Sequence, residues 1–167
     1  MDSAVRVRES RGTLGVMAGT IVVGVDGSPV SADALRWAAA EARLRGARLQ
    51  VVHAWTFIPP TAIGDPGLIA VPSGDLVGQL DAEEASAGAG LDAVIAEALG
   101  PTPDVPLEST LVEGDAGDVL VAASRDADLV VVGSHGRSGF RAALVGSVSR
   151  HVVDHAECAV VVVKPQS

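Results

Sequence analysis

Four residues in the C-terminal third of the sequence have the types and spacing that suit the binding of a phosphate group. They fit the pattern G-x2-G-x9-G-[ST] and are Gly133, Gly136, Gly146 and Ser147. Glycines let a backbone reach positive φ and let amide groups approach an anion without a Cβ in the way. A helix expected from residue 147 onward would add unpaired N–H groups and the positive end of its dipole. The spacing therefore predicts a phosphate-binding loop. It is not a Walker loop, because its glycine-rich segment contains no lysine.

The hydroxyl groups of Ser147 and Ser149 could add hydrogen bonds to the same phosphate. A simpler interpretation is open for Ser147, which could only cap the helix and so stabilise it by about 1 kcal/mol. The two roles are compatible.

The histidines and the cysteine form no comparable pattern. His135 lies inside the loop, but no acid or nucleophile is identifiably paired with it. His151 and His155 have i,i+4 spacing without a third ligand in view. Cys158 is the single cysteine, which excludes an intrachain disulfide. We therefore expect neither a catalytic residue nor a metal site.

The charge and hydropathy of the chain argue against nucleic acids and membranes as partners. The net charge is −9, and the stretch between Arg48 and Arg125 contains twelve Asp and Glu and no basic residue. Such a chain repels polyanions. No uncharged apolar run reaches 18 residues, and the first 20 residues lack the apolar stretch of a signal peptide. We expect a cytoplasmic protein.

The elements that would position the loop follow from the apolar pattern. Strands are predicted at 20–25, 48–55, 107–112, 129–132 and 159–163, and helices at 29–45, 75–99, 115–124 and 147–155. Strands and helices therefore alternate along the chain, which favours a doubly wound α/β fold, a five-stranded parallel sheet with helices on both faces. In the last helix, Val148, Val152 and Val153 are expected to face inward. Residues 19–165 form a single predicted domain, and residues 1–18, which lack periodicity, form a flexible N-terminal extension.

Long stretches of the sequence resemble the universal stress protein family. They are VVGVDGSPVSADALRWA from residue 22, VVHAW from residue 51, VVVGSHGRSGFRAALVGSVS from residue 130 and CAVVVVKP from residue 158. The resemblance covers residues 19–165. It implies a Rossmann-like fold of the adenine nucleotide alpha hydrolase-like kind with strand order 3-2-1-4-5, and a homodimer formed through the last strand. It also implies that members with the G-x2-G-x9-G-[ST] pattern bind ATP.

The same resemblance assigns roles to individual residues. Asp26 would contact the ribose hydroxyls, and the backbone of Ala54 would meet the edge of the adenine. A simpler interpretation of Asp26 is a local Asx turn before the first helix. Ser149 could equally assist a bound Mg²⁺. The residues expected to bind the nucleotide are Gly24, Asp26, Ala54, Val132, Gly133, Gly136, Gly146, Ser147, Val148 and Ser149.

Three functions remain open at this level. The first is a regulatory protein of the stress response that binds ATP, with cyclic AMP as an alternative ligand, and whose bound state is recognised by another protein. The second is slow ATP hydrolysis or self-phosphorylation at Ser147 or Ser149. The third is a dimeric interaction module that works without nucleotide. The predicted phosphate-binding loop favours the first function. The second is disfavoured because no residue is identifiable as a catalytic base.

Overall fold

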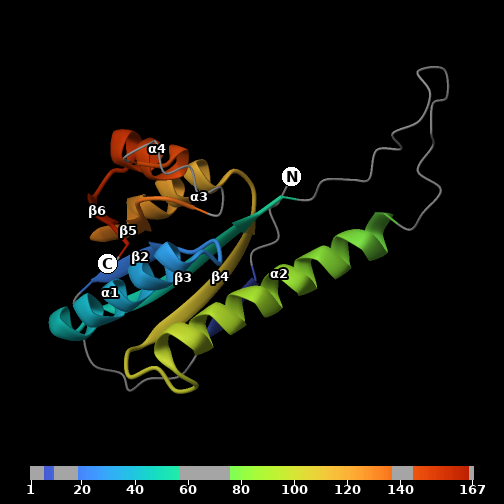
Figure 1. Ribbon diagram of the computed structural model, residues 1–167, viewed down its shortest axis with the longest axis horizontal. Coiled ribbons are helices and arrows are strands. Elements are labelled where there is room, and N and C mark those ends of the chain that lie inside the picture. Colours follow the sequence, from blue (N-terminus) through green and yellow to red (C-terminus); the bar gives the residue numbers. More distant parts are fainter. Residues whose placement is uncertain (1–5, 10–18, 57–75, 137–144, 166–167) are drawn as a thin grey trace.

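The fold is built on one six-stranded sheet. The structure is a computed structural model, described here for residues 6–9, 19–56, 76–136 and 145–165. The strand order is β1-β4-β3-β2-β5-β6 (Figure 1). The strands are β1 (Arg6–Glu9), β2 (Thr20–Gly24), β3 (Arg48–Trp55), β4 (Leu107–Glu113), β5 (Leu129–Gly133) and β6 (Ala159–Val163). Strands β2 to β6 are parallel, and their order confirms the predicted 3-2-1-4-5 sheet.

Strand β1 is a difference from the sequence-based expectation. The sequence indicates no regular structure for residues 1–18, yet Arg6–Glu9 pairs antiparallel with Glu108–Leu111 of β4. The physical reason is that β4 would otherwise leave its outer backbone groups unpaired at the sheet edge. Residues 1–5 and 10–18 lie outside the described part of the chain.

In the described part of the chain, four α-helices cover the two faces of the sheet, as predicted. They are α1 (Pro29–Arg45), α2 (Leu76–Leu99), α3 (Ala116–Ala123) and α4 (Ser147–His155), and a short 3-10 helix, η1 (Ser124–Asp126), extends α3. Figure 1 shows α1 and α2 on one face and α3 and α4 together on the other. Among the described residues, no helix is long and apolar enough to cross a membrane.

Alternating valines of the central strands bury both faces. In β2, Val23 packs in the cluster beneath α1 and α2, whereas Val22 packs in the cluster beneath α3 and α4. In β5, Val131 packs in the cluster beneath α1 and α2, and Val130 packs in the cluster beneath α3 and α4. All four side chains are fully buried. The two central strands of the sheet, β2 and β5, are therefore packed against helices on both faces.

The connections leave the sheet in opposite directions at its centre. The chain passes from β2 to α1 on one face and from the neighbouring β5 to α4 on the other. This reversal between adjacent parallel strands opens a crevice at their carboxyl ends, where α/β proteins bind ligands.

Candidate functional site

A pocket of about 320 Å³ lies at this crevice. We call it the switch-point pocket. All ten residues that the sequence assigns to nucleotide binding line it, and they come from β2, β3, β5, α4 and the loops that follow β2 and β5: Gly24, Asp26, Ala54, Val132, Gly133, Gly136, Gly146, Ser147, Val148 and Ser149. The structure thus brings together segments that are more than 100 residues apart in the chain.

Six further described residues line the pocket and were not predicted: Val25, Ser31, Val52, Ala116, Leu120 and His135. Ala116 and Leu120 belong to α3 and, with Val52 and Val132, give the pocket an apolar wall. The sequence gives little indication that Ala116 and Leu120 line the pocket, because the face of α3 that meets the pocket is decided by packing and not by a motif.

The turn after β2 is held by hydrogen bonds of Asp26. Its Oδ1 accepts from the backbone N–H of Ser28 at 3.0 Å, so the predicted Asx turn is present. The backbone N–H of Asp26 donates to Ser31 Oγ at 3.3 Å. Ser28 in turn caps α1, because its Oγ accepts from the N–H of Ser31 at 3.2 Å. These contacts hold the Asp26 carboxylate at the pocket while leaving room for a ligand beside it.

Gly136 brings the loop after β5 against this carboxylate. A Cβ at Gly136 would lie 2.6 Å from Oδ2 of Asp26, and one at Gly133 would lie 3.1 Å from Val30 Cγ1. The expectation of positive φ in this loop is wrong for its described glycines, because Gly133, Gly136 and Gly146 all have negative or extended φ. They serve close approach and not an unusual backbone conformation.

The N-terminus of α4 opens onto the pocket without a side-chain cap. Gly146 occupies the N-cap position with φ −68° and ψ 165°, and no side chain of the described residues accepts a hydrogen bond there. The alternative interpretation, that Ser147 only caps the helix, is therefore wrong, since Ser147 is the first helical residue. Its side chain is exposed. The first N–H groups of α4 can thus serve a ligand.

Ser149 and Ser134 fix the ends of the loop. The buried Ser149 donates its hydroxyl to the backbone oxygen of Gly133, which ties α4 to the end of β5. The backbone N–H of Gly146 donates to Ser134 O at 2.7 Å, and Ser134 N–H donates to Val163 O of β6 at 2.7 Å. Ser134 Oγ also bonds His135 Nδ1 at 2.7 Å. The loop therefore begins and ends on the sheet.

The valines of α4 differ from expectation. Val152 is fully buried, but Val148 is 36% exposed at the mouth of the pocket and Val153 is 52% exposed. The inward orientation expected for the latter two is wrong, because the first turn of α4 faces the pocket and only one valine reaches the core beneath α3 and α4.

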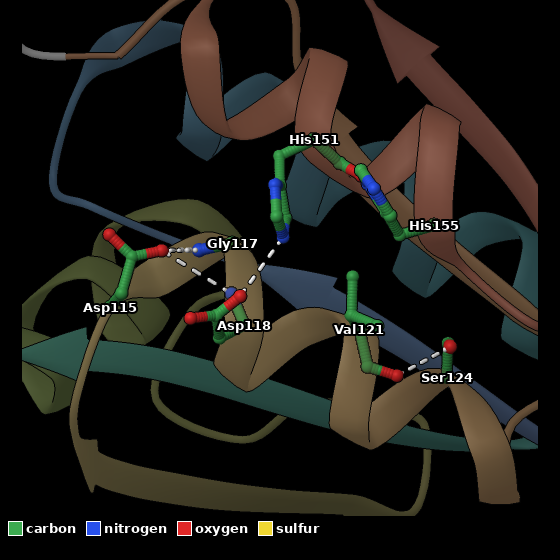
Figure 2. A network of polar contacts seen from close by, with 7 residues as sticks. All are labelled: Asp115, Gly117, Asp118, Val121, Ser124, His151 and His155. Atoms are coloured by element: carbon green, nitrogen blue, oxygen red, sulfur yellow. Dashed lines mark hydrogen bonds and ion pairs between the residues drawn. The ribbon is translucent and has the colours of Figure 1, made fainter.

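Helices α3 and α4 meet through His151 (Figure 2). Its Nε2 lies 3.0 Å from Asp118 Oδ1, and a Cβ at Gly117 would lie 2.7 Å from His151 Cδ2. The His151 and His155 rings stack with centroids 4.5 Å apart. Asp115 caps α3 by accepting from Gly117 N–H at 2.9 Å. The apolar wall and the uncapped helix end of the pocket are thus on two helices in direct contact.

Comparison with known proteins identifies relatives of this chain. Residues 17–164 match the universal stress protein family. A universal stress protein of Mycobacterium tuberculosis is 38% identical over 144 residues, which cover 86% of this chain and 45% of that protein. The chain therefore spans about half the length of the curated relatives it matches.

Two solved structures with the same fold were determined with adenine nucleotides. A universal stress protein in complex with cAMP is 28% identical, with a TM-score of 0.52 over 89% of this chain and 98% of the other. A universal stress protein from Archaeoglobus fulgidus in complex with dAMP is 26% identical, with a TM-score of 0.51 over 89% of this chain and 100% of the other. On the extent of the family match and the identity to its relatives, this chain belongs to the universal stress protein family.

Proposed function

We propose that this protein binds ATP in the switch-point pocket and acts as a regulatory nucleotide-binding module of the stress response. The observation that supports the proposal most directly is the uncapped N-terminus of α4, which opens onto a pocket whose other wall is apolar. A ligand that suits such a pocket has a flat apolar part and an anionic end, as an adenine nucleotide does.

Different residues of the pocket contact the adenine, the ribose and the phosphates. The adenine lies against Leu120 and Val132 and meets the backbone of Ala54. The ribose hydroxyls bond the carboxylate of Asp26. The phosphates lie at Gly136, Gly146 and the N–H groups of α4, with Val148 and Ser149 behind them. Ser147, whose side chain is exposed at the pocket, adds its hydroxyl to the phosphates.

Mg²⁺ would accompany the phosphates and neutralise part of their charge. The hydroxyl of Ser149 donates to Gly133 O, so it would face a metal through its oxygen lone pairs only. Cyclic AMP is the alternative ligand, supported by the solved complex of a similar protein. Its single phosphate would engage fewer of the N–H groups of α4 than the triphosphate of ATP does.

Binding would add a shared ligand to the contacts that three segments of the pocket already make, such as that of Ser149 with Gly133 O. The turn after β2, the loop after β5 and α4 would all contact one ligand. A ligand that binds only the folded state raises its stability in proportion to the logarithm of its concentration. The bound form is therefore a distinct state that another protein can recognise.

We also propose that the protein forms a homodimer through β6. Strand β6 pairs with β5 on one side only and ends the sheet, and its sequence is AVVVV. An apolar edge strand invites pairing, and symmetric pairing with a second copy would satisfy it. Val160 and Val162 also pack against the cluster beneath α3 and α4, so each lysine variant is first checked for a native circular dichroism spectrum. We expect the folded Val160→Lys and Val162→Lys variants to be monomers in sedimentation velocity, where the native protein sediments as a dimer. A native protein that sediments as a monomer would contradict the dimer.

Nucleotide binding is tested with a substitution that should stabilise the fold but weaken the binding of a phosphate. Ser147→Asp places a negative charge in the first turn of α4, which stabilises a helix by about 0.3–1 kcal/mol. The same charge repels a phosphate at that position. We expect ATP to bind Ser147→Asp at least about tenfold more weakly than the native protein, while the melting temperature of the free protein stays equal or rises.

Ser147→Asn is the matched control, because it changes the side chain without adding charge. We expect it to retain most of the affinity. Calorimetric titration with ATP, ADP and cyclic AMP, with and without Mg²⁺, measures the affinities of the native protein and the two variants. If no nucleotide binds the folded native protein, or if Ser147→Asp binds ATP as tightly as Ser147→Asn does, the proposal is wrong.

A further inference from the structure

A second and larger pocket adjoins the switch-point pocket. Its volume is about 570 Å³, and it lies between the carboxyl ends of β2 and β3 and one face of α2. We call it the α2 pocket. Val25, Asp26 and Ala54 line both pockets, so the two spaces meet at the residues that flank the carboxylate of Asp26.

The lining of the α2 pocket combines aromatic and aliphatic side chains with carboxylates. Trp55, Leu91 and Val94 are its large apolar side chains. His53 also lines it and is fixed by a contact of 2.8 Å between its Nδ1 and Val25 O. The carboxylates among the described lining residues are Asp26 and Glu83, and no Lys or Arg is among them. Such a lining suits an uncharged or cationic group with a flat face and disfavours an anion.

The position of Asp26 connects this lining to the nucleotide. In the proposed function, on which this inference rests, Asp26 bonds the ribose hydroxyls. A group attached to one of those hydroxyls would leave the nucleotide beside Asp26, where the two pockets meet, and the α2 pocket offers space for it. We propose that this protein accepts adenine nucleotides whose ribose 2′ or 3′ oxygen bears an uncharged or cationic acyl group, with that group in the α2 pocket.

The experiment uses ATP and its 2′(3′)-O-(N-methylanthraniloyl) ester as probes, because the ester adds one uncharged aromatic group to the ribose. Gly90→Leu blocks the α2 pocket. A Cβ at Gly90 would meet no atom within 4 Å, so the new side chain extends into open space. Gly88→Leu is the control. Gly88 lies two residues away on the same helix, lines a different pocket against β4 and does not line the α2 pocket.

Both substitutions remove a helix glycine at a residue without positive φ, so both favour helix formation by a similar amount. Neither residue lines the switch-point pocket. The ester loses one ribose hydroxyl that would donate to Asp26 but gains contacts in the α2 pocket, so we expect it to bind the native protein within about tenfold of ATP. We expect Gly90→Leu to weaken the ester by about tenfold and to change ATP by less than about twofold, and Gly88→Leu to leave both unchanged.

A charged substituent gives a further test, because adenosine 3′,5′-bisphosphate would direct a phosphate toward Asp26 and Glu83. We expect it to bind the native protein about tenfold more weakly than AMP. The inference is overturned if ATP binds the native protein but the ester binds much more weakly, if Gly90→Leu affects both probes alike or neither, or if the bisphosphate matches AMP. Failure of ATP itself to bind the native protein would instead overturn the proposed function.

Discussion

The close approach of Gly136 to Asp26 allows a quantitative test of how the loop supports ribose binding. A methyl group at Gly136 would lie 2.6 Å from Asp26 Oδ2, well inside van der Waals contact. Because the φ of Gly136 is not in the left-handed region, the backbone itself tolerates alanine. The carboxylate must therefore move. Hydrogen bonds to a charged group contribute about 1.5–3 kcal/mol, so Gly136→Ala should weaken ATP about 10- to 150-fold.

The assay is a double-mutant cycle with Asp26→Ala, measured by calorimetric titration of ATP. Asp26→Ala removes the same ribose contact, and in that background the methyl group at Gly136 meets no carboxylate. Gly136→Ala should then cost clearly less affinity than in the native protein, because only its effect on the phosphates remains, so the coupling energy should be most of its effect in the native protein. Asp26→Asn is a useful third variant, because its amide oxygen can still accept from Ser28 N–H and preserve the Asx turn.

The result that would refute this reasoning is additivity. If the two single effects sum to that of the double variant within about 0.5 kcal/mol, the loop glycine does not act through Asp26. Denaturant unfolding of all four proteins separates this outcome from simple loss of structure. Asp26→Ala should itself lower stability by about 1 kcal/mol, because the N–H of Ser28 loses its acceptor.

Three further predictions concern packing and protonation. Gly24→Ala should destabilise the fold by about 1–3 kcal/mol, because its Cβ would lie 2.7 Å from Leu120 Cδ1, and Leu120→Ala should relieve most of that cost in denaturant unfolding. Gly117→Ala should cost about 1–3 kcal/mol more in the native protein than in His151→Ala, where the imidazole that it would meet at 2.7 Å is gone. Burial raises the pKa of the Cys158 thiol. Its alkylation by iodoacetamide should therefore be slower in the folded protein than in the unfolded chain. Its contribution to stability, present at neutral pH, should be lost as pH rises from the ordinary thiol pKa toward the raised one.

Much of the fold could be predicted because the spacing of apolar residues changes sharply at the ends of the strands and helices. Strand β3, strand β6 and helix α4 have the bounds expected from their apolar runs. Helix α1 likewise ends where expected, because Gly46 follows it with a φ of 62°, a left-handed conformation that favours glycine. The strand order could not come from period alone. It followed from resemblance to a family, and pairing between strands confirms it.

What could not be predicted depends on contacts between distant segments. Strand β1 exists because β4 offers an edge, and nothing within Arg6–Glu9 indicates that pairing. Ala116 and Leu120 line the pocket because α3 packs against the sheet with that face inward. The role of the loop glycines was predicted only in part. A Gly-rich motif suggests positive φ, whereas here the absence of a Cβ matters because Asp26 lies so close to Gly136.

Helix α3 accounts for how the pocket keeps its shape although the loop after β5 is long. One side of α3 provides the apolar wall through Ala116 and Leu120, and its first turn receives the imidazole of His151 against Gly117 (Figure 2). The uncapped end of α4 is one turn away from His151 on the same helix. The distance between the two walls is therefore set by packing between helices, which is close and hard to deform. A ligand that spans the pocket meets a site whose width is fixed before it binds, and substitutions at Gly117 should be felt in affinity as well as in stability.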